Sequence, residues 1–119
     1  MHDKNGELPV FVKWMEFVSW LFPTMEKLPK KTRFTISQRV ENYALDIVED
    51  LIEARYARNK KEILMRVNLK IEKMRILFRI CNERKFVSLK AYKHFMSSID
   101  NVGRMIGGWI KQQGGQSGR

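Results

Sequence analysis

Apolar residues recur every three or four positions through most of the chain, the spacing of amphipathic helices. The first such stretch runs to about Leu28, with Pro9 in its first turn and Pro23 inside it. Because proline lacks a backbone N–H, we expect Pro23 to kink this helix or leave a carbonyl unpaired without ending it. The apolar stripe consists of Val10, Phe11, Trp14, Phe17, Val18, Leu21, Met25 and Leu28.

Three further helices follow a connection over residues 28–32. Thr35 and Gln38 have the spacing of a capping box, which predicts a second helix from there to about residue 59. A third helix is predicted over 61–84, and Ser88 is placed to cap a fourth. The outer face of the second helix is acidic and is most simply solvated, with Glu41, Asp46, Glu49, Asp50 and Glu53.

The predicted fold is all-α, an up-down-up-down antiparallel four-helix bundle. Helices of about 20 residues are roughly 30 Å long, and short connections make sequential neighbours antiparallel. The length of 119 residues fits one domain, with a core that needs no metal or disulfide. We assign residues 1–113 to this domain and expect the Gly-rich tail, 114–119, to be disordered.

The third predicted helix carries two apolar stripes on opposite faces. One is the natural core stripe, formed by Ile63, Val67, Ile71, Met74, Phe78 and Cys81. The other consists of Met65, Leu69, Ile76 and Ile80. A helix that also packs against another subunit uses such a second stripe, so we expect a homo-oligomer with these four residues at its interface. Scattered surface aliphatics are the alternative.

Positive charge is concentrated in the second half of the chain. Residues 1–54 carry seven bases and nine acids, whereas residues 55–119 carry sixteen bases and four acids. This distribution favours a polyanionic partner such as nucleic acid, and a solvated helix face is the alternative. On the third helix the basic flanks include Arg66, Lys70, Lys73, Arg75 and Arg79, and Lys111 is added from the fourth. Alternatively, these cations pair with the acidic second helix.

Glycines gather in the fourth helix, where each costs roughly 1 kcal/mol. Gly103 and Gly107 are four residues apart and share a face, which would permit a close helix crossing. Trp109 is interpreted as a core or interface anchor and not as a platform for base stacking.

The residues that catalysis would need do not form a recognised pattern. Ala91 stands three residues before His94, where a carboxylate-bridged metal site needs Glu. Arg84 is too far from His94 for the Arg and His spacing of small helical ribonucleases, and Cys81 lies on the core stripe. We therefore expect neither an enzyme nor a cofactor or metal. The apolar runs are shorter than the ~18 residues of a membrane span, which predicts a cytoplasmic protein without a membrane partner.

The run Val102-Gly103-Arg104-Met105-Ile106-Gly107-Gly108-Trp109-Ile110 resembles the C-terminal signature of the accessory variability determinant (Avd) proteins of diversity-generating retroelements. Agreement elsewhere lies in Leu21-Phe22-Pro23, Leu28-Pro29-Lys30, Met74-Arg75 and Phe78-Arg79, and the resemblance covers about residues 10–112.

The resemblance implies a four-helix bundle that assembles into a positively charged pentameric barrel. It also implies binding to the retroelement's reverse transcriptase and template RNA, in support of adenine-directed mutagenic copying, without catalytic activity. Arg75, Arg79 and Arg104 match basic positions of the family. Related bundles encoded in intervening sequences of bacterial large-subunit ribosomal RNA genes imply the alternative of a stand-alone RNA-binding protein. A purely structural oligomer or a ribonuclease is a third possibility.

Overall fold

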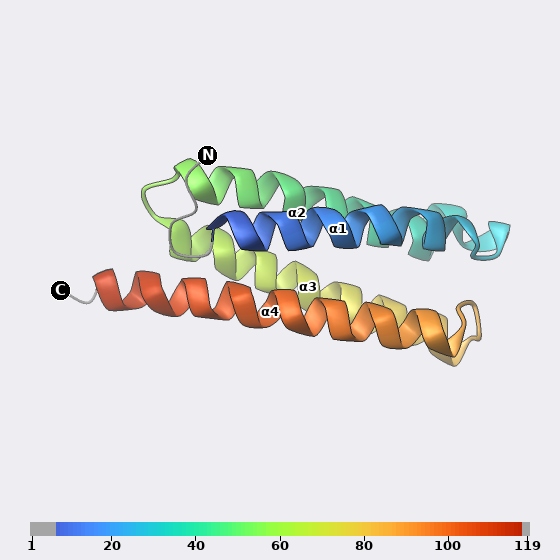
Figure 1. Ribbon diagram of the computed structural model, residues 1–119. Helices are drawn as coiled ribbons and strands as arrows, with labels where there is room; N and C mark the ends of the chain where they lie inside the picture. The colour runs from blue at the N-terminus through green and yellow to red at the C-terminus, as the bar shows by residue number, and fades with distance from the viewer. Residues whose placement is uncertain (1–6, 118–119) are drawn as a thin grey trace.

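The computed structural model describes residues 7–117 as an all-α bundle of four helices (Figure 1). They are α1 (Glu7–Glu26), α2 (Gln38–Tyr56), α3 (Lys60–Glu83) and α4 (Leu89–Ser117). Each helix runs antiparallel to the one before it, and contacts join α1 to α2, α2 to α3, α3 to α4 and α4 back to α1. The bundle measures 50 × 23 × 21 Å, and residues 7–117 contain no strand. The predicted up-down-up-down fold is confirmed.

Helix α1 continues through Pro23, as predicted, and ends at Glu26. The missing N–H of Pro23 would have bonded the carbonyl of Ser19. Because Ser19 lies on the exposed side of α1, water can reach that carbonyl.

The predicted capping box at the start of α2 is wrong. A 3₁₀ turn (Lys30–Thr32) and a π-helical turn (Arg33–Ser37) lead directly into α2, so Ser37 already has helical backbone angles. A capping residue needs an extended backbone to turn its side chain onto the following N–H groups. Thr35 instead donates its hydroxyl to the carbonyl of Thr32 at 3.3 Å, and no side chain caps α2.

Helices α3 and α4 are joined by a tight turn. Phe86 donates its N–H to the carbonyl of Cys81 at 2.8 Å, and Lys85 has the left-handed φ of 60°. These are features of a Schellman ending, in which glycine is the usual left-handed residue. Ser88 then accepts the N–H of Ala91 at 3.0 Å, so the predicted cap of α4 is confirmed.

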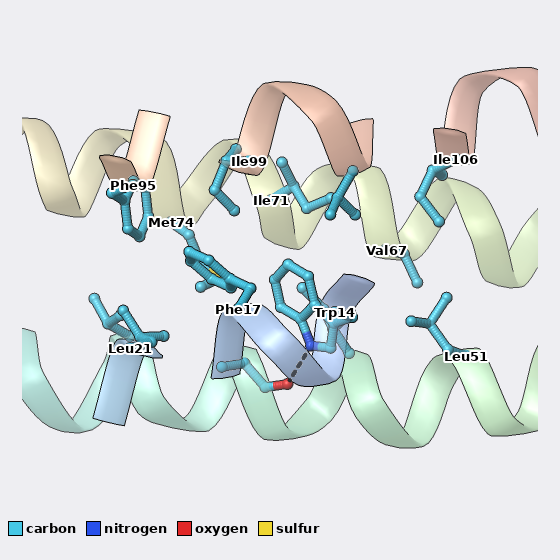
Figure 2. Close-up of a cluster of buried hydrophobic side chains, with 14 of the residues drawn as sticks. Trp14, Phe17, Leu21, Leu51, Val67, Ile71, Met74, Phe95, Ile99 and Ile106 are labelled. Carbon is cyan, nitrogen blue, oxygen red and sulfur yellow. Dashed lines mark hydrogen bonds between the residues drawn. The ribbon is translucent and has the colours of Figure 1, made fainter. Parts of the chain in front are cut away.

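The core contains residues from all four helices (Figure 2). Trp14 of α1 donates its indole N–H to the carbonyl of Ala44 on α2 at 3.0 Å. Phe78 of α3 stacks on Phe95 of α4 with ring centroids 3.8 Å apart, and Phe17 of α1 meets Phe95 edge-on at 5.4 Å. All six residues of the predicted α3 core stripe are buried. The predicted helical period therefore places the core correctly.

Helix α4 extends to Ser117, through the first four residues of the segment for which the sequence predicted disorder. Gly118 and Arg119 lie outside the described residues.

Candidate nucleic-acid and partner interface

The second apolar stripe of α3 faces away from the core. Met65 and Leu69 are 55% and 57% exposed, and Ile76 and Ile80 are 49% and 36% exposed. The stripe is thus available to a partner, as an interface requires.

Helix α2 also exposes apolar residues, which the sequence pattern did not single out. Leu45 and Ile52 are 46% and 47% exposed, and Tyr56 is 78% exposed. They follow one another at intervals of seven and four residues, so they lie on one face of α2. Glu49 is exposed within the same interval. The signal that could have revealed this face is the same heptad-like spacing that identified the α3 stripe.

On the side of α3 that faces α2, cations are held by the acidic residues of α2. Lys70 donates to Asp50 at 2.5 Å, and Arg66 lies 3.3 Å from Asp50 and 3.4 Å from Glu53. The expectation that Asp50 is solvated is wrong, because it is 6% exposed. Arg66 and Lys70 therefore pair with the acidic residues of α2, which is the alternative that the sequence left open.

Lys73 has a different environment on the same side of α3. Its ammonium group lies 5.7 Å from the ring centroid of Tyr43 on α2, a cation–π distance, and the residue is exposed.

On the side of α3 that faces α4, Arg75 is half-buried. It bonds Asp100 of α4 at 2.5 Å, and its Nε lies 3.3 Å from Glu72 without the alignment of a hydrogen bond. Arg79 pairs with Glu83 on its own helix at 3.2 Å, and both side chains are more than half exposed. Exposed pairs of this kind are worth little, so Arg79 remains accessible to a partner.

We call the surface where Arg75, Arg79, Arg104 and Lys111 lie, together with Lys93, the α3–α4 seam. A hollow of about 500 Å³ at its centre is lined by Arg75, Asp100 and Arg104, among others. Lys93, Arg104 and Lys111 are exposed, and their spacing of eleven and seven residues places them on one face of α4. Within the described part of the chain these three form no ion pair. Sequence reasoning missed Lys93, which the same spacing would have identified.

The glycine-rich stretch of α4 does not make the predicted helix crossing within the subunit. A Cβ added at Gly103 would meet the side chain of Arg75 at 3.3 Å, whereas one at Gly107 would meet nothing within 4 Å. Gly103 therefore makes room for a guanidinium group and not for a backbone, and the expectation for Gly107 is wrong within the subunit. Trp109 is 3% exposed, so its side chain lies in the core, and its buried indole N–H has no hydrogen-bond partner among the described residues.

Cys81 and His94 lie in different environments. Burial raises the pKa of the Cys81 thiol to about 11, which keeps it protonated at neutral pH. His94 is exposed, with its ring 4.4 Å from that of Trp20. Over residues 7–117, no three His, Cys, Asp or Glu side chains gather as a metal site would require. No helix in the same range is long and apolar enough to cross a bilayer.

A comparison with known protein families matches residues 10–113 to one of them, the bAvd-like family. A comparison with curated proteins finds no match.

Proposed function

Since the chain belongs to the bAvd-like family, we propose that it is an accessory protein of a diversity-generating retroelement. Proteins of the Avd-like family are in general accessory proteins without catalytic activity. In this role the protein works in the cytoplasm without activity of its own, binds the element's reverse transcriptase and template RNA, and supports mutagenic copying. The observation that carries the proposal is the family match, which extends over residues 10–113 and includes the glycine-rich stretch of α4.

The α3–α4 seam is the surface that we propose for these partners. Lys93, Arg104 and Lys111 are exposed cations without ion pairs among the described residues, so they can meet phosphate or carboxylate groups at little desolvation cost. Arg75 is less available because Asp100 and Glu72 hold it, and its proposed role is to shape the seam. Lys70 and Arg66 likewise support the bundle by holding Asp50.

The protein assembles, we propose, as a ring in which the α3 stripe of one subunit packs on the exposed apolar face of α2 in the next. Both faces are apolar with exposed charges around them: Lys73 and Arg79 flank the α3 stripe, and Glu49 lies within the α2 face. Contacts between two different faces form a ring when the rotation closes. The family resemblance suggests five subunits.

Co-purification with the reverse transcriptase encoded beside the gene tests this function. We expect the wild-type protein to be retained by the tagged polymerase, and Lys93→Glu/Arg104→Glu to be lost with helicity and oligomer size unchanged. The matched control is Arg58→Glu/Lys61→Glu, which makes the same reversal of charge at exposed positions beside the turn between α2 and α3, outside the seam. Equal retention of both variants would refute the seam.

The genomic neighbourhood separates the two RNA-binding alternatives. A reverse transcriptase gene beside a pair of repeats that differ at adenines would support the retroelement function. A location inside a ribosomal RNA gene would contradict it and favour the intervening-sequence type.

A further inference from the structure

A second hollow, of about 410 Å³, lies where α1 ends and α4 begins. We call it the α1–α4 hollow. Trp20 and Phe86 form part of its wall, and Lys27, Lys90 and His94 also line it. Of the described residues, none that lines it is Asp or Glu. Its volume falls in the range of small-ligand pockets, roughly 300–1,000 Å³, and would accommodate one nucleobase.

Trp20 and Phe86, which line the hollow together with the His94 ring packed on Trp20, can both be reached from solvent. Trp20 is half-buried, whereas the other two tryptophans of the chain, Trp14 and Trp109, are buried. Phe86 is also half-buried, and the ammonium group of Lys31 lies 5.6 Å from its ring centroid. The hollow thus combines partly exposed aromatic surface with two lysine side chains, Lys27 and Lys90, and Lys31 lies beside its Phe86 wall.

The wall holds both neutral and charged hydrogen-bonding groups. Thr24 donates its hydroxyl to the carbonyl of Trp20 at 2.9 Å, and the hydroxyl oxygen of Ser88 accepts the N–H of Ala91, which leaves the Ser88 proton free to donate. The charged donors at the rim are the exposed ammonium groups of Lys27 and Lys90. Ammonium groups beside aromatic rings are the combination that single-stranded nucleic acid uses, one for the phosphate and the other for the base.

The turn that forms one side of the hollow is held in an unfavourable conformation. Lys85 occupies a left-handed φ of 60°, and this places Phe86 where its N–H bonds the carbonyl of Cys81. A lysine in such a conformation costs stability, and residues of this kind concentrate at functional sites. Keeping lysine in place of glycine adds another positive charge beside the hollow.

We propose that the α1–α4 hollow binds one unpaired nucleotide of single-stranded RNA. Its base lies against Trp20 and Phe86, and its phosphates approach Lys27 and Lys90. This inference rests on the proposed function for the choice of RNA as the partner, but it places a contact away from the α3–α4 seam. Because every base has a stacking face and lysines contact only phosphate, the site tolerates any sequence and weakens with salt.

Binding of fluorescein-labelled decauridylate, followed by anisotropy, tests the site. We expect Lys27→Gln/Lys90→Gln to weaken binding about tenfold, and Trp20→Leu to do the same with helicity retained. Trp20→Phe should keep most of the affinity because it keeps an aromatic face. The control, Arg58→Gln/Lys61→Gln, removes an equal charge far from the hollow and should cost less than about threefold.

Tryptophan fluorescence gives a second readout that needs no disruptive substitution. Because Trp14 and Trp109 are buried, decauridylate should quench the emission of Trp20, and Trp20→Phe should abolish the quenching. Circular dichroism of each variant verifies folding.

Three results would overturn the site. They are equal loss of affinity in the lysine variant and its control, absence of any decauridylate binding, and equally tight and equally sensitive binding of a ten-base-pair RNA duplex. Loss of the reverse transcriptase from Lys27→Gln/Lys90→Gln with RNA affinity unchanged would assign the hollow to a protein instead. In each case, retention of the reverse transcriptase by the wild-type protein would leave the proposed function standing, whereas its failure would refute that function separately.

Discussion

At the scale of single residues, the buried carboxylate of Asp50 is stabilised by the two cations beside it. Its side chain is 9% exposed and has two cationic partners, Lys70 and Arg66. Taking away one partner of a buried charge costs more than the pair contributes, because the remaining charge stays desolvated. We predict that Lys70→Met lowers the free energy of unfolding by about 1–3 kcal/mol, less than for a lone pair since Arg66 remains.

Urea denaturation at neutral pH measures the effect of Lys70→Met. Arg66→Met should cost less, because the Arg66 side chain is 43% exposed against 22% for Lys70. The double variant Asp50→Asn/Lys70→Met should recover part of the loss. A Lys70→Met protein as stable as the wild type would mean that Arg66 alone satisfies Asp50.

The buried thiol of Cys81 makes the free energy of unfolding depend on pH. Burial raises the pKa of its thiol from 9.0 to about 11, so the folded protein holds a proton that the unfolded chain releases. The resulting stability is fully present below pH 9 and is lost as pH rises toward 11. Between pH 7 and pH 10 we predict a loss of about 1 kcal/mol in the wild type that Cys81→Ala does not undergo. Parallel urea titrations compare the two proteins, and identical pH slopes would contradict the prediction.

At the scale of elements, the turn between α3 and α4 stores strain at one position. Lys85 has a φ of 60°, whereas Arg84 before it has a φ of −86°. Glycine adopts the left-handed region without steric cost, so Lys85→Gly should raise the free energy of unfolding by about 0.5–1 kcal/mol. Arg84→Gly is the matched control and should lower it. Thermal melting of the two variants decides, and destabilisation by both would show that the Lys85 side chain makes contacts that outweigh the strain.

Sequence periodicity predicts the helices, their order and the α3 core stripe because burial on one face of a helix requires that spacing. It does not predict how the helices are rotated against one another. The partners of Lys70 and Arg75 depend on that rotation, as does the environment of Gly107, which follows the same spacing as Gly103 but faces open space. Likewise, Thr35 and Gln38 satisfy the pattern of a capping box, yet the π-helical turn before α2 leaves no extended residue to use it.

The α1–α4 hollow escaped sequence reasoning for a related reason. Trp20 and Phe86 are 66 positions apart and belong to different parts of the bundle, so no local spacing brings them together. The turn between α3 and α4 brings them together. It contains Lys85 in a left-handed backbone conformation, which sequence propensity assigns to glycine and not to lysine.

At the scale of the whole molecule, charge and apolar surface together decide how copies assemble. The subunit exposes one apolar stripe on α3 and another apolar face on α2, and burial of such faces is the main favourable term in association. If α3 packs on α2 of the next subunit, a single charged substitution in either face interrupts every contact of the ring. We predict that Leu69→Lys and Leu45→Lys each yield monomers by light scattering.

Mixing the two variants distinguishes a contact between unlike faces from one between like faces. Leu69→Lys retains an intact α2 face and Leu45→Lys retains an intact α3 stripe, so the mixture can form one unaltered contact but no closed ring. Dimers containing one copy of each variant should therefore appear on mixing and nowhere else. If α3 stripes instead packed on one another, Leu45→Lys would assemble alone and mixing would rescue nothing, because the face-to-face contact then involves Leu69 on both sides.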